Sequence, residues 1–303
     1  MTHSNTDLDQ WKHFEIPGKV AFSKDSDGLV KINIATPQSS AEVYLQGAHV
    51  TAFQQHGEDP MLFMSASGRM SRGTMLHGGI PICFPWFGNR PGEKLSHGFA
   101  RLYPWDLITA TVNAQEEVEL LFQLPQTLLK ESGWLPVETF YRVTIGEKLT
   151  LELNVNNTTQ ELFSYEECLH AYFLVGDIGE TTIHGLKDLH YLDKTEDLIS
   201  KLEHEDEIPI TQETNRIYLN STAPIEIHDR AQKRTIRIEK NFSHSTVVWN
   251  PWSEKAKTLP DFAPDDFKQM LCVESGNVGE FAKELPPGKV SVLQVQLSIV
   301  KKA

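Results

Sequence analysis

Residues 139–155 read TFYRVTIGEKLTLELNV and carry a β-hairpin pattern. Residues 139–145 can pair with residues 148–155 across a turn at Gly146 and Glu147. In the second half of the hairpin apolar and polar residues alternate, which places the apolar ones on one face of a strand: Leu149, Leu151, Leu153 and Val155. The pattern predicts paired antiparallel strands with one face in a core and the other exposed to solvent or to a ligand.

Short runs of the same kind recur on both sides of this hairpin. They predict strands at residues 20–23, 29–35, 42–53, 118–124, 164–175, 217–220, 225–228, 235–239, 245–249, 270–274 and 290–300. Helical periodicity is scarce, and only residues 126–130 and 264–268 fit a turn or so of helix. We therefore expect an all-β protein, a large antiparallel β-sandwich with few short helices. Residues 1–18 would be a lead-in, and residues 19–303 a single domain.

The composition of the chain excludes several classes of partner. Its 303 residues contain 28 Lys and Arg against 41 Asp and Glu, so the formal net charge is −13. Long-range repulsion of this kind disfavours nucleic acids and anionic membranes. An anionic substrate would have to be bound by a local cluster of cations.

Apolar runs in the sequence are too short for a membrane helix, which needs about 18 to 20 residues. The first residues, MTHSNTDLDQW, lack a basic region followed by a hydrophobic one, so we expect a cytoplasmic protein. The three cysteines Cys83, Cys168 and Cys272 lie far apart within apolar segments. They are expected to be buried free thiols rather than disulfides or zinc ligands.

Residues 75–105, MLHGGIPICFPWFGNRPGEKLSHGFARLYPW, do not fit a regular strand or helix. Their glycines allow close approach of backbone to a ligand, and their prolines restrict the chain between the glycines. We interpret the segment as a rigid loop that shapes a pocket, with Phe87 among the aromatic residues of its floor. The alternative is a proline-rich surface crossing packed by its own aromatic side chains.

Two strands can each deliver one ionisable group to a polar cleft. Alternation within residues 164–175 places His170 on a face with Glu166, Cys168 and Tyr172, and residues 270–275 place Glu274 on a face with Cys272. A histidine and a partly buried glutamate can act as acid and base in one step. Taken alone, both residues could equally be structural.

Spacing in the sequence offers no established metal or nucleotide motif. HxH, HExxH and paired CxxC patterns are absent, as are a P-loop and a strand-to-helix GxGxxG. A metal site made of His170, His97 and Glu274 remains an alternative, which would make the protein a metal-dependent β-sandwich enzyme.

Several motifs resemble those of the hexose-6-phosphate mutarotases, the glucose-6-phosphate 1-epimerase branch of the aldose 1-epimerase family. They occur in the same order, at similar spacing, and cover nearly the whole chain: GGIPICFPWFG at 78–88, HGFAR at 97–101, ECLHAYF at 167–173, WNPW at 249–252 and CVE at 272–274. The resemblance implies the galactose mutarotase-like fold, no cofactor and no metal. It also implies isomerase activity of the EC 5.1.3 class in carbohydrate metabolism.

By position, the resemblance implies that His170 and Glu274 are the catalytic residues and that His97 is a second histidine of the site. We expect Glu274 to take the proton of the C1 hydroxyl while a protonated His170 donates to the ring oxygen. His97 would donate a hydrogen bond to the open-chain sugar.

Arginine suits a phosphate because its guanidinium can bind two oxygens at once. Arg101 holds the family position and is the expected phosphate ligand, while Arg90 and Lys94 flank the loop. Family members commonly read RGGIP where this chain has His77, and Asn215 stands where an aspartate is expected. Both are candidate substrate-binding residues, and Arg72 could supply the missing guanidinium.

The sequence thus predicts a monomeric mutarotase for a hexose 6-phosphate, with a small sugar as its partner. Two alternatives remain open beside the metal enzyme. One is a sugar- or sugar-phosphate-binding protein of the same fold without turnover, and the other is a mutarotase for a non-phosphorylated aldose.

Overall fold

A nine-stranded antiparallel sheet forms one side of the protein in a computed structural model, which describes residues 8–68, 71–74 and 77–300. The predicted hairpin lies within this sheet, but its turn spans residues 146–148 because Ile145 pairs with Leu149. All four predicted apolar positions of its second strand are fully buried. The strands are, in spatial order, β16 (Ile208–Pro209), β13 (Thr181–His184), β18 (Ile225–Asp229), β19 (Arg234–Asn241), β23 (Val290–Val300), β9 (Leu149–Asn156), β8 (Glu138–Ile145), β7 (Val118–Leu124) and β6 (Asp106–Val112).

Two further large sheets pack against the first. The four-stranded sheet follows chain order: β1 (Val20–Lys24), β2 (Val30–Ala35), β3 (Ser39–Tyr44) and β4 (His49–Gln55). The eight-stranded sheet has the order β15 (Ile199–Leu202), β14 (His190–Asp193), β17 (Thr214–Leu219), β20 (Ser245–Asn250), β21 (Met270–Asn277), β11 (Glu167–Leu169) and β5 (Ile82–Cys83), and β12 (Tyr172–Leu174) also pairs with β21. A small pair joins β10 (Phe163–Tyr165) to β22 (Lys283–Leu285).

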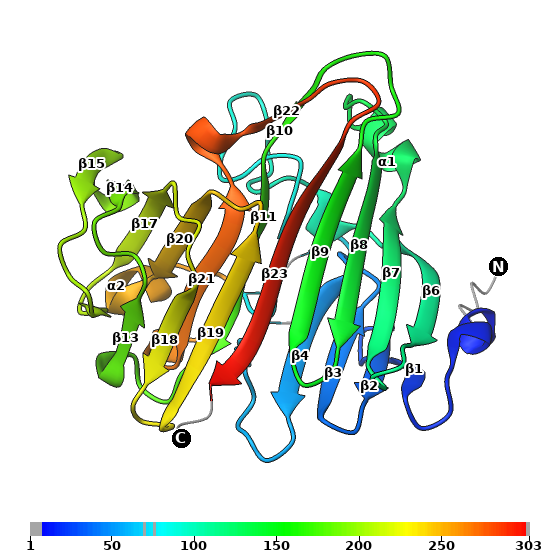
Figure 1. Ribbon diagram of the computed structural model, residues 1–303, viewed down its shortest axis with the longest axis horizontal. Coiled ribbons are helices and arrows are strands. Elements are labelled where there is room, and N and C mark those ends of the chain that lie inside the picture. The colour runs from blue at the N-terminus through cyan, green and yellow to red at the C-terminus, as the bar shows by residue number, and fades with distance from the viewer. Residues whose placement is uncertain (1–7, 69–70, 75–76, 301–303) are drawn as a thin grey trace.

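One continuous hydrophobic core joins the three large sheets. It contains Val43 from β3, Leu151 from β9 and Val273 from β21. In Figure 1 the nine-stranded sheet crosses the view, with β2–β4 behind one half and β17, β20 and β21 beside the other. The predicted antiparallel β-sandwich is confirmed.

Helices among the described residues are short. They are α1 (Gln126–Glu131), α2 (Trp252–Ala256) and the 3₁₀ turns η1 (Leu8–Phe14), η2 (Ala100–Leu102), η3 (Ile178–Glu180), η4 (Lys194–Glu196), η5 (Asp266–Lys268) and η6 (Gly279–Phe281). Both predicted helical segments are present as α1 and η5, whereas α2 and η1 were not predicted. None of the described helices has the length and apolar character needed to cross a membrane.

Two strand predictions were wrong in detail, and both differences shape the site. Residues 164–175, expected as one strand, form β10, β11 and β12 with a break at His170 and Ala171. Residues 42–53, expected as a strand with a bulge or bend at Gly47, form β3 and β4 with a full turn between them, in which Gly47 has a φ of 73°. Alternation of side chains reports which face a residue occupies, but a break can preserve that alternation and so escape detection.

Candidate active site

A pocket of about 230 Å³ lies where the eight-stranded sheet meets the segment at residues 77–101. Strands β12, β17, β20 and β21 supply one wall, and the loop and two short helices supply the rest. The lining residues are His77, Phe87, Ser96, His97, Arg101, His170, Tyr172, Lys194, Asn215, Val247, Trp249, Lys255 and Glu274. The expected catalytic and substrate-binding residues belong to this set except Arg72, and the flanking cations Arg90 and Lys94 also lie outside it.

His170 and Glu274 meet because β21 pairs with two strands at once. Leu169 at the end of β11 pairs with Ser275, and Tyr172 at the start of β12 pairs with Cys272. The break between β11 and β12 therefore places His170 opposite Glu274, with Nε2 3.2 Å from Oε1. The ring of Tyr172 stacks on the imidazole at a centroid distance of 4.7 Å and fixes its orientation.

The environment of this pair decides where its proton lies. Burial raises the pKa of Glu274 to about 8, although Lys194, the Cys168 thiol and Arg101 oppose the rise. Burial lowers the pKa of His170 well below 6.5, and His97 and Arg101 lower it further. At neutral pH these two shifts favour one proton on the Glu274 carboxyl beside a neutral imidazole. The expectation of a protonated His170 does not describe this resting state.

His97 presents its second ring nitrogen to the pocket in a defined tautomer. The Gly88 N–H lies 3.3 Å from its Nδ1 and donates to it, and the Cys83 Sγ lies 3.4 Å away. Burial, with Arg101 and Lys194, lowers the pKa of His97 to about 3, so the ring is neutral. A neutral ring that accepts at Nδ1 carries its proton on Nε2. His97 is thus a hydrogen-bond donor 5.5 Å, between ring centroids, from His170.

Close backbone contacts hold the loop that carries His97. A Cβ at Gly98, where φ is +68°, would lie 2.0 Å from the carbonyl oxygen of Phe84. The Glu166 carboxylate accepts hydrogen bonds from the backbone N–H groups of Phe87, at 2.9 Å, and Gly279, at 2.7 Å. Phe87 lies against His97 edge to face at 4.7 Å. The interpretation of residues 75–105 as a rigid pocket wall agrees with this geometry for the described part of the segment.

Arg101 is 8% exposed and reaches the pocket from η2. Its Nη2 donates to the carbonyl oxygen of Ser96 at 2.6 Å. Its Nε is buried without a hydrogen-bond partner among the described residues. The guanidinium is therefore oriented but not neutralised.

The other cations expected at the pocket lie elsewhere. Arg72 is exposed and borders a separate, mainly apolar cavity beside Trp11 and Tyr103. The Arg90 guanidinium packs on the ring of Trp134 at 4.6 Å, and Lys94 is exposed. Closeness along the chain to the pocket loop did not translate into closeness to the pocket.

His77 is tied to a partner that the sequence did not suggest. Its Nδ1 lies 2.7 Å from Oδ1 of Asp261, and the histidine lowers the pKa of that carboxyl against the effect of burial. Asn215 pairs through its backbone with Trp249, whose ring centroid lies 6.2 Å from that of His77. The two departures from the family pattern thus lie in the same pocket.

Two lysines that line the pocket were not predicted from the sequence. Lys194 begins η4 directly after β14, and Lys255 lies in α2. Neither β14 nor α2 was predicted, so no argument placed these side chains. A lysine directly after a short strand carries little information in a single sequence.

Three metal-ligand types also come together here. The nearest ligand atoms of His170, Cys272 and Glu274 all lie within 4.8 Å of one another. They are the imidazole, thiol and carboxylate groups that zinc binds. All three cysteines are buried and free, as predicted.

The comparisons with known proteins identify the family. The aldose 1-epimerase family profile matches residues 30–298. A relative from Cenchrus ciliaris, provisionally named glucose-6-phosphate 1-epimerase, is 33% identical over 91% of this chain and 87% of its own. A relative of the same provisional name from Salmonella typhimurium is 34% identical over 82% of this chain and 83% of its own.

Solved structures agree with this assignment. The crystal structure of YeaD from Salmonella typhimurium, provisionally described as a mutarotase, superposes with a TM-score of 0.88 at 29% identity. The match covers 97% of this chain and 99% of that one. The chain belongs to the aldose 1-epimerase family.

Proposed function

We propose that this protein interconverts the α and β anomers of a hexose 6-phosphate such as glucose 6-phosphate. The observation that carries the proposal is the contact of 3.2 Å between His170 Nε2 and Glu274 Oε1, inside a pocket whose lining includes the cations Arg101, Lys194 and Lys255. Family membership and the names of the relatives support the same reaction.

Anomer exchange needs one group that accepts a proton and one that donates a proton. Glu274 takes the proton of the C1 hydroxyl, and His170 gives a proton to the ring oxygen. The bond between C1 and the ring oxygen breaks, and C1 becomes an aldehyde. Rotation about C1–C2 presents the other face of the carbonyl, and reversal of both proton transfers closes the ring as the other anomer.

The pair starts this cycle with the single proton that the site already holds. Before the reaction that proton is favoured on Glu274, since burial favours the neutral form of both groups. Its transfer to His170 across 3.2 Å makes the carboxylate a base and the imidazolium an acid.

His97 and Arg101 would stabilise the open-chain sugar. The Nδ1 atom of His97 accepts from the Gly88 N–H, so the Nε2–H of the ring is directed away from the loop backbone. This Nε2–H is the donor to the sugar. Arg101 offers charged N–H groups without a carboxylate partner, in keeping with its expected role as a phosphate ligand. Donors that are already oriented favour the transition state because they need little rearrangement during the reaction.

A panel of aldoses and their 6-phosphates, measured by saturation-transfer NMR, tests the proposal. We expect exchange between anomeric signals to accelerate with enzyme concentration, most strongly for a hexose 6-phosphate. Faster exchange of glucose alone would favour the mutarotase for a non-phosphorylated aldose. Binding of a sugar without faster exchange would favour the non-catalytic alternative.

The same proposal includes the setting of the protein. We infer a monomer in the cytoplasm that takes a small sugar and no nucleic acid. The net charge of −13 supports the last of these points, because it repels nucleic acid. Size-exclusion chromatography with light scattering tests the oligomeric state.

A further inference from the structure

We propose that Lys194 and Lys255 form the phosphate-recognising mouth of the pocket, and that the Asp193–Lys201 contact positions Lys194 for this role. The inference rests on the proposed function, since it names the residues that distinguish a sugar phosphate from a sugar. It also assigns to these two lysines the phosphate binding that was expected of Arg72.

Lys194 extends over the pocket loop rather than into solvent alone. Its Nζ lies 5.4 Å from the centroid of the Phe87 ring. A Cβ built on Gly88 would be 3.9 Å from the same nitrogen. Within the described ranges, no ion pair joins Lys194 or Lys255 to a carboxylate. Both ammonium groups are therefore available to an anion.

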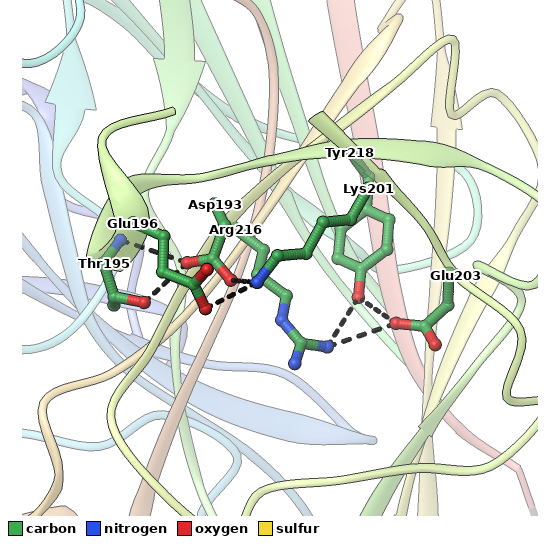
Figure 2. A network of polar contacts seen from close by, with 7 residues as sticks. All are labelled: Asp193, Thr195, Glu196, Lys201, Glu203, Arg216 and Tyr218. Atoms are coloured by element: carbon green, nitrogen blue, oxygen red, sulfur yellow. Dashed lines mark hydrogen bonds and ion pairs between the residues drawn. The ribbon is translucent and has the colours of Figure 1, made fainter. Parts of the chain in front are cut away.

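The residues on either side of Lys194 are held by a polar network (Figure 2). Oδ1 of Asp193 accepts from the backbone N–H of Thr195 at 3.0 Å and from its hydroxyl at 2.6 Å. Nζ of Lys201 binds Oδ2 of Asp193 at 3.0 Å and Oε1 of Glu196 at 2.6 Å. The turn that carries Lys194 is thus fastened on both sides, while Lys194 itself takes no part in the network.

The second half of the network anchors the hairpin of β14 and β15 to β17, the strand that contains Asn215. Glu203 accepts from Tyr218 at 2.8 Å and from Arg216 at 3.1 Å. The Arg216 guanidinium also lies 4.7 Å from the centroid of the Tyr191 ring in β14. In Figure 2 the Lys201 side chain lies between the two groups of contacts. The position of Lys194 is consequently coupled to the wall of the pocket.

Lys255 approaches from α2, whose start is fixed by Asn250. The Asn250 amide donates to the carbonyl oxygens of Phe267 and Met270, each at 2.8 Å, and its oxygen accepts from the Trp252 N–H at 2.8 Å. This fixed corner directly follows Trp249, which lines the pocket. Lys194 and Lys255 therefore extend from two backbone segments, η4 and α2, that hydrogen bonds hold in place.

The charge of the lining favours a dianion. Arg101, Lys194 and Lys255 are its permanent cations, and Glu274 is its carboxylate among the described lining residues. Glu274 is deeply buried, and burial raises its pKa to about 8, so it holds a proton at neutral pH. An anion entering the mouth meets three positive charges and no ionised carboxylate of the lining.

The test compares glucose 6-phosphate with glucose at low ionic strength, where exposed charges are least screened. The measured quantity is the ratio of their kcat/KM values for anomer exchange. Lys194→Ala should lower this ratio about 10- to 100-fold, the worth of a charge-assisted hydrogen bond. Lys255→Ala should lower it in the same direction. The control Lys257→Ala removes an exposed lysine paired with Glu254 outside the pocket, and the ratio should stay constant.

A ratio that is unchanged in Lys194→Ala, or equal losses with both substrates, would overturn the inference. If the wild-type protein exchanges the anomers of no sugar, the proposed function fails while the anion site remains testable. Titration with inorganic phosphate followed by ³¹P NMR then decides. Weaker binding by Lys194→Ala than by Lys257→Ala supports the site, and equal binding rejects it.

The positioning role of Asp193 has its own readout. Asp193→Asn should lower the ratio in the wild-type background and leave it unchanged in a Lys194→Ala background, because its effect passes through Lys194. Equal losses in both backgrounds would show a purely structural effect and would reject the positioning role. Thermal unfolding of each variant verifies that the compared proteins are folded.

Discussion

His170 Nε2 lies 3.2 Å from Glu274 Oε1 at the point where β21 changes its partner from β11 to β12. The two residues are distant in sequence, and the break between the partner strands aligns them. The contact is buried, with 9% of the His170 side chain and 1% of the Glu274 side chain exposed. A single proton shared in such a place links catalysis, pH dependence and stability.

The first prediction concerns the pair itself. His170→Gln and Glu274→Gln should each reduce anomer exchange roughly 100- to 10,000-fold, because each removes one partner of the proton transfer. Saturation-transfer NMR with glucose 6-phosphate measures the loss. His204→Gln, at an exposed histidine outside the pocket, is the control. Near-normal exchange in either pair variant would exclude the assigned roles.

The pH profile should show a basic limb near pH 8. Below the raised pKa of Glu274, about 8, the pair holds one proton, and above it the pair holds none. The acid limb should lie well below pH 6.5, where His170 is protonated and the pair holds two protons. Because Lys194 opposes the rise of the Glu274 pKa, Lys194→Ala should move the basic limb to higher pH. A limb fixed at the same pH in this variant would contradict that coupling.

Burial of Glu274 should also cost stability at high pH. Its pKa is raised from 4.5 to about 8 in the folded state, so the folded protein binds the proton more tightly. The contribution is fully present below pH 4.5 and is lost as the pH rises through 8. As the pH rises from 4.5 to 8, the wild type should lose a few kcal/mol in free energy of unfolding that Glu274→Gln does not lose.

Urea denaturation at several pH values measures this difference. Glu284→Gln, at an exposed position of β22, is the matched control and should run parallel to the wild type. Parallel curves for Glu274→Gln as well would show that the buried carboxyl does not set the pH dependence.

Gly98 should be intolerant of a side chain. A Cβ there would lie 2.0 Å from the Phe84 carbonyl oxygen, whereas a Cβ at Gly92 would meet no atom within 4 Å. Both residues have positive φ, so the difference between the two alanine variants isolates the clash. We expect Gly92→Ala to cost about 1 kcal/mol and Gly98→Ala at least twice as much, with loss of activity through His97. Equal unfolding midpoints would argue against the tight wall.

Removal of metal should leave the rate unchanged. The proposed proton transfers use the side chains of His170 and Glu274, and the family resemblance implies no metal. Exchange of glucose 6-phosphate anomers before and after dialysis against a chelator checks this, with elemental analysis of both samples. A loss that zinc restores would instead favour a metal-dependent enzyme, with His170, Cys272 and Glu274 as the ligands that the structure brings together in place of the expected set with His97.

Much of the fold was predictable because its causes are local. Alternation at Leu149, Leu151, Leu153 and Val155 places them in the core whatever strands lie beside them. Helix α2 escaped prediction because its five residues begin at Trp252, held by the Asn250 side chain rather than by a periodic pattern. Short elements of this kind depend on contacts that the local pattern does not report.

The residues of the site also divide into those that the sequence predicted and those that it did not. Motif position selected His170, Glu274, His97 and Arg101, and the pocket holds all four. Closeness along the chain to His77 suggested Arg72, which lies at another cavity, and neither signal pointed to Lys194 or Lys255. Sequence distance is a poor guide for long side chains on loops, because a turn of a few residues can direct them to either side of a sheet.

By itself, the sequence determined the fold class, the buried faces of the long strands and the family, and it suggested the acid–base residues. Only the tertiary structure decided that Glu274 lies in a setting that raises its pKa, that Asp261 contacts His77 and that Lys194 and Lys255 line the pocket. The physical reason is that strand alternation is set by neighbouring residues. Burial, charge and proximity within a pocket are set instead by residues that lie far apart in the chain.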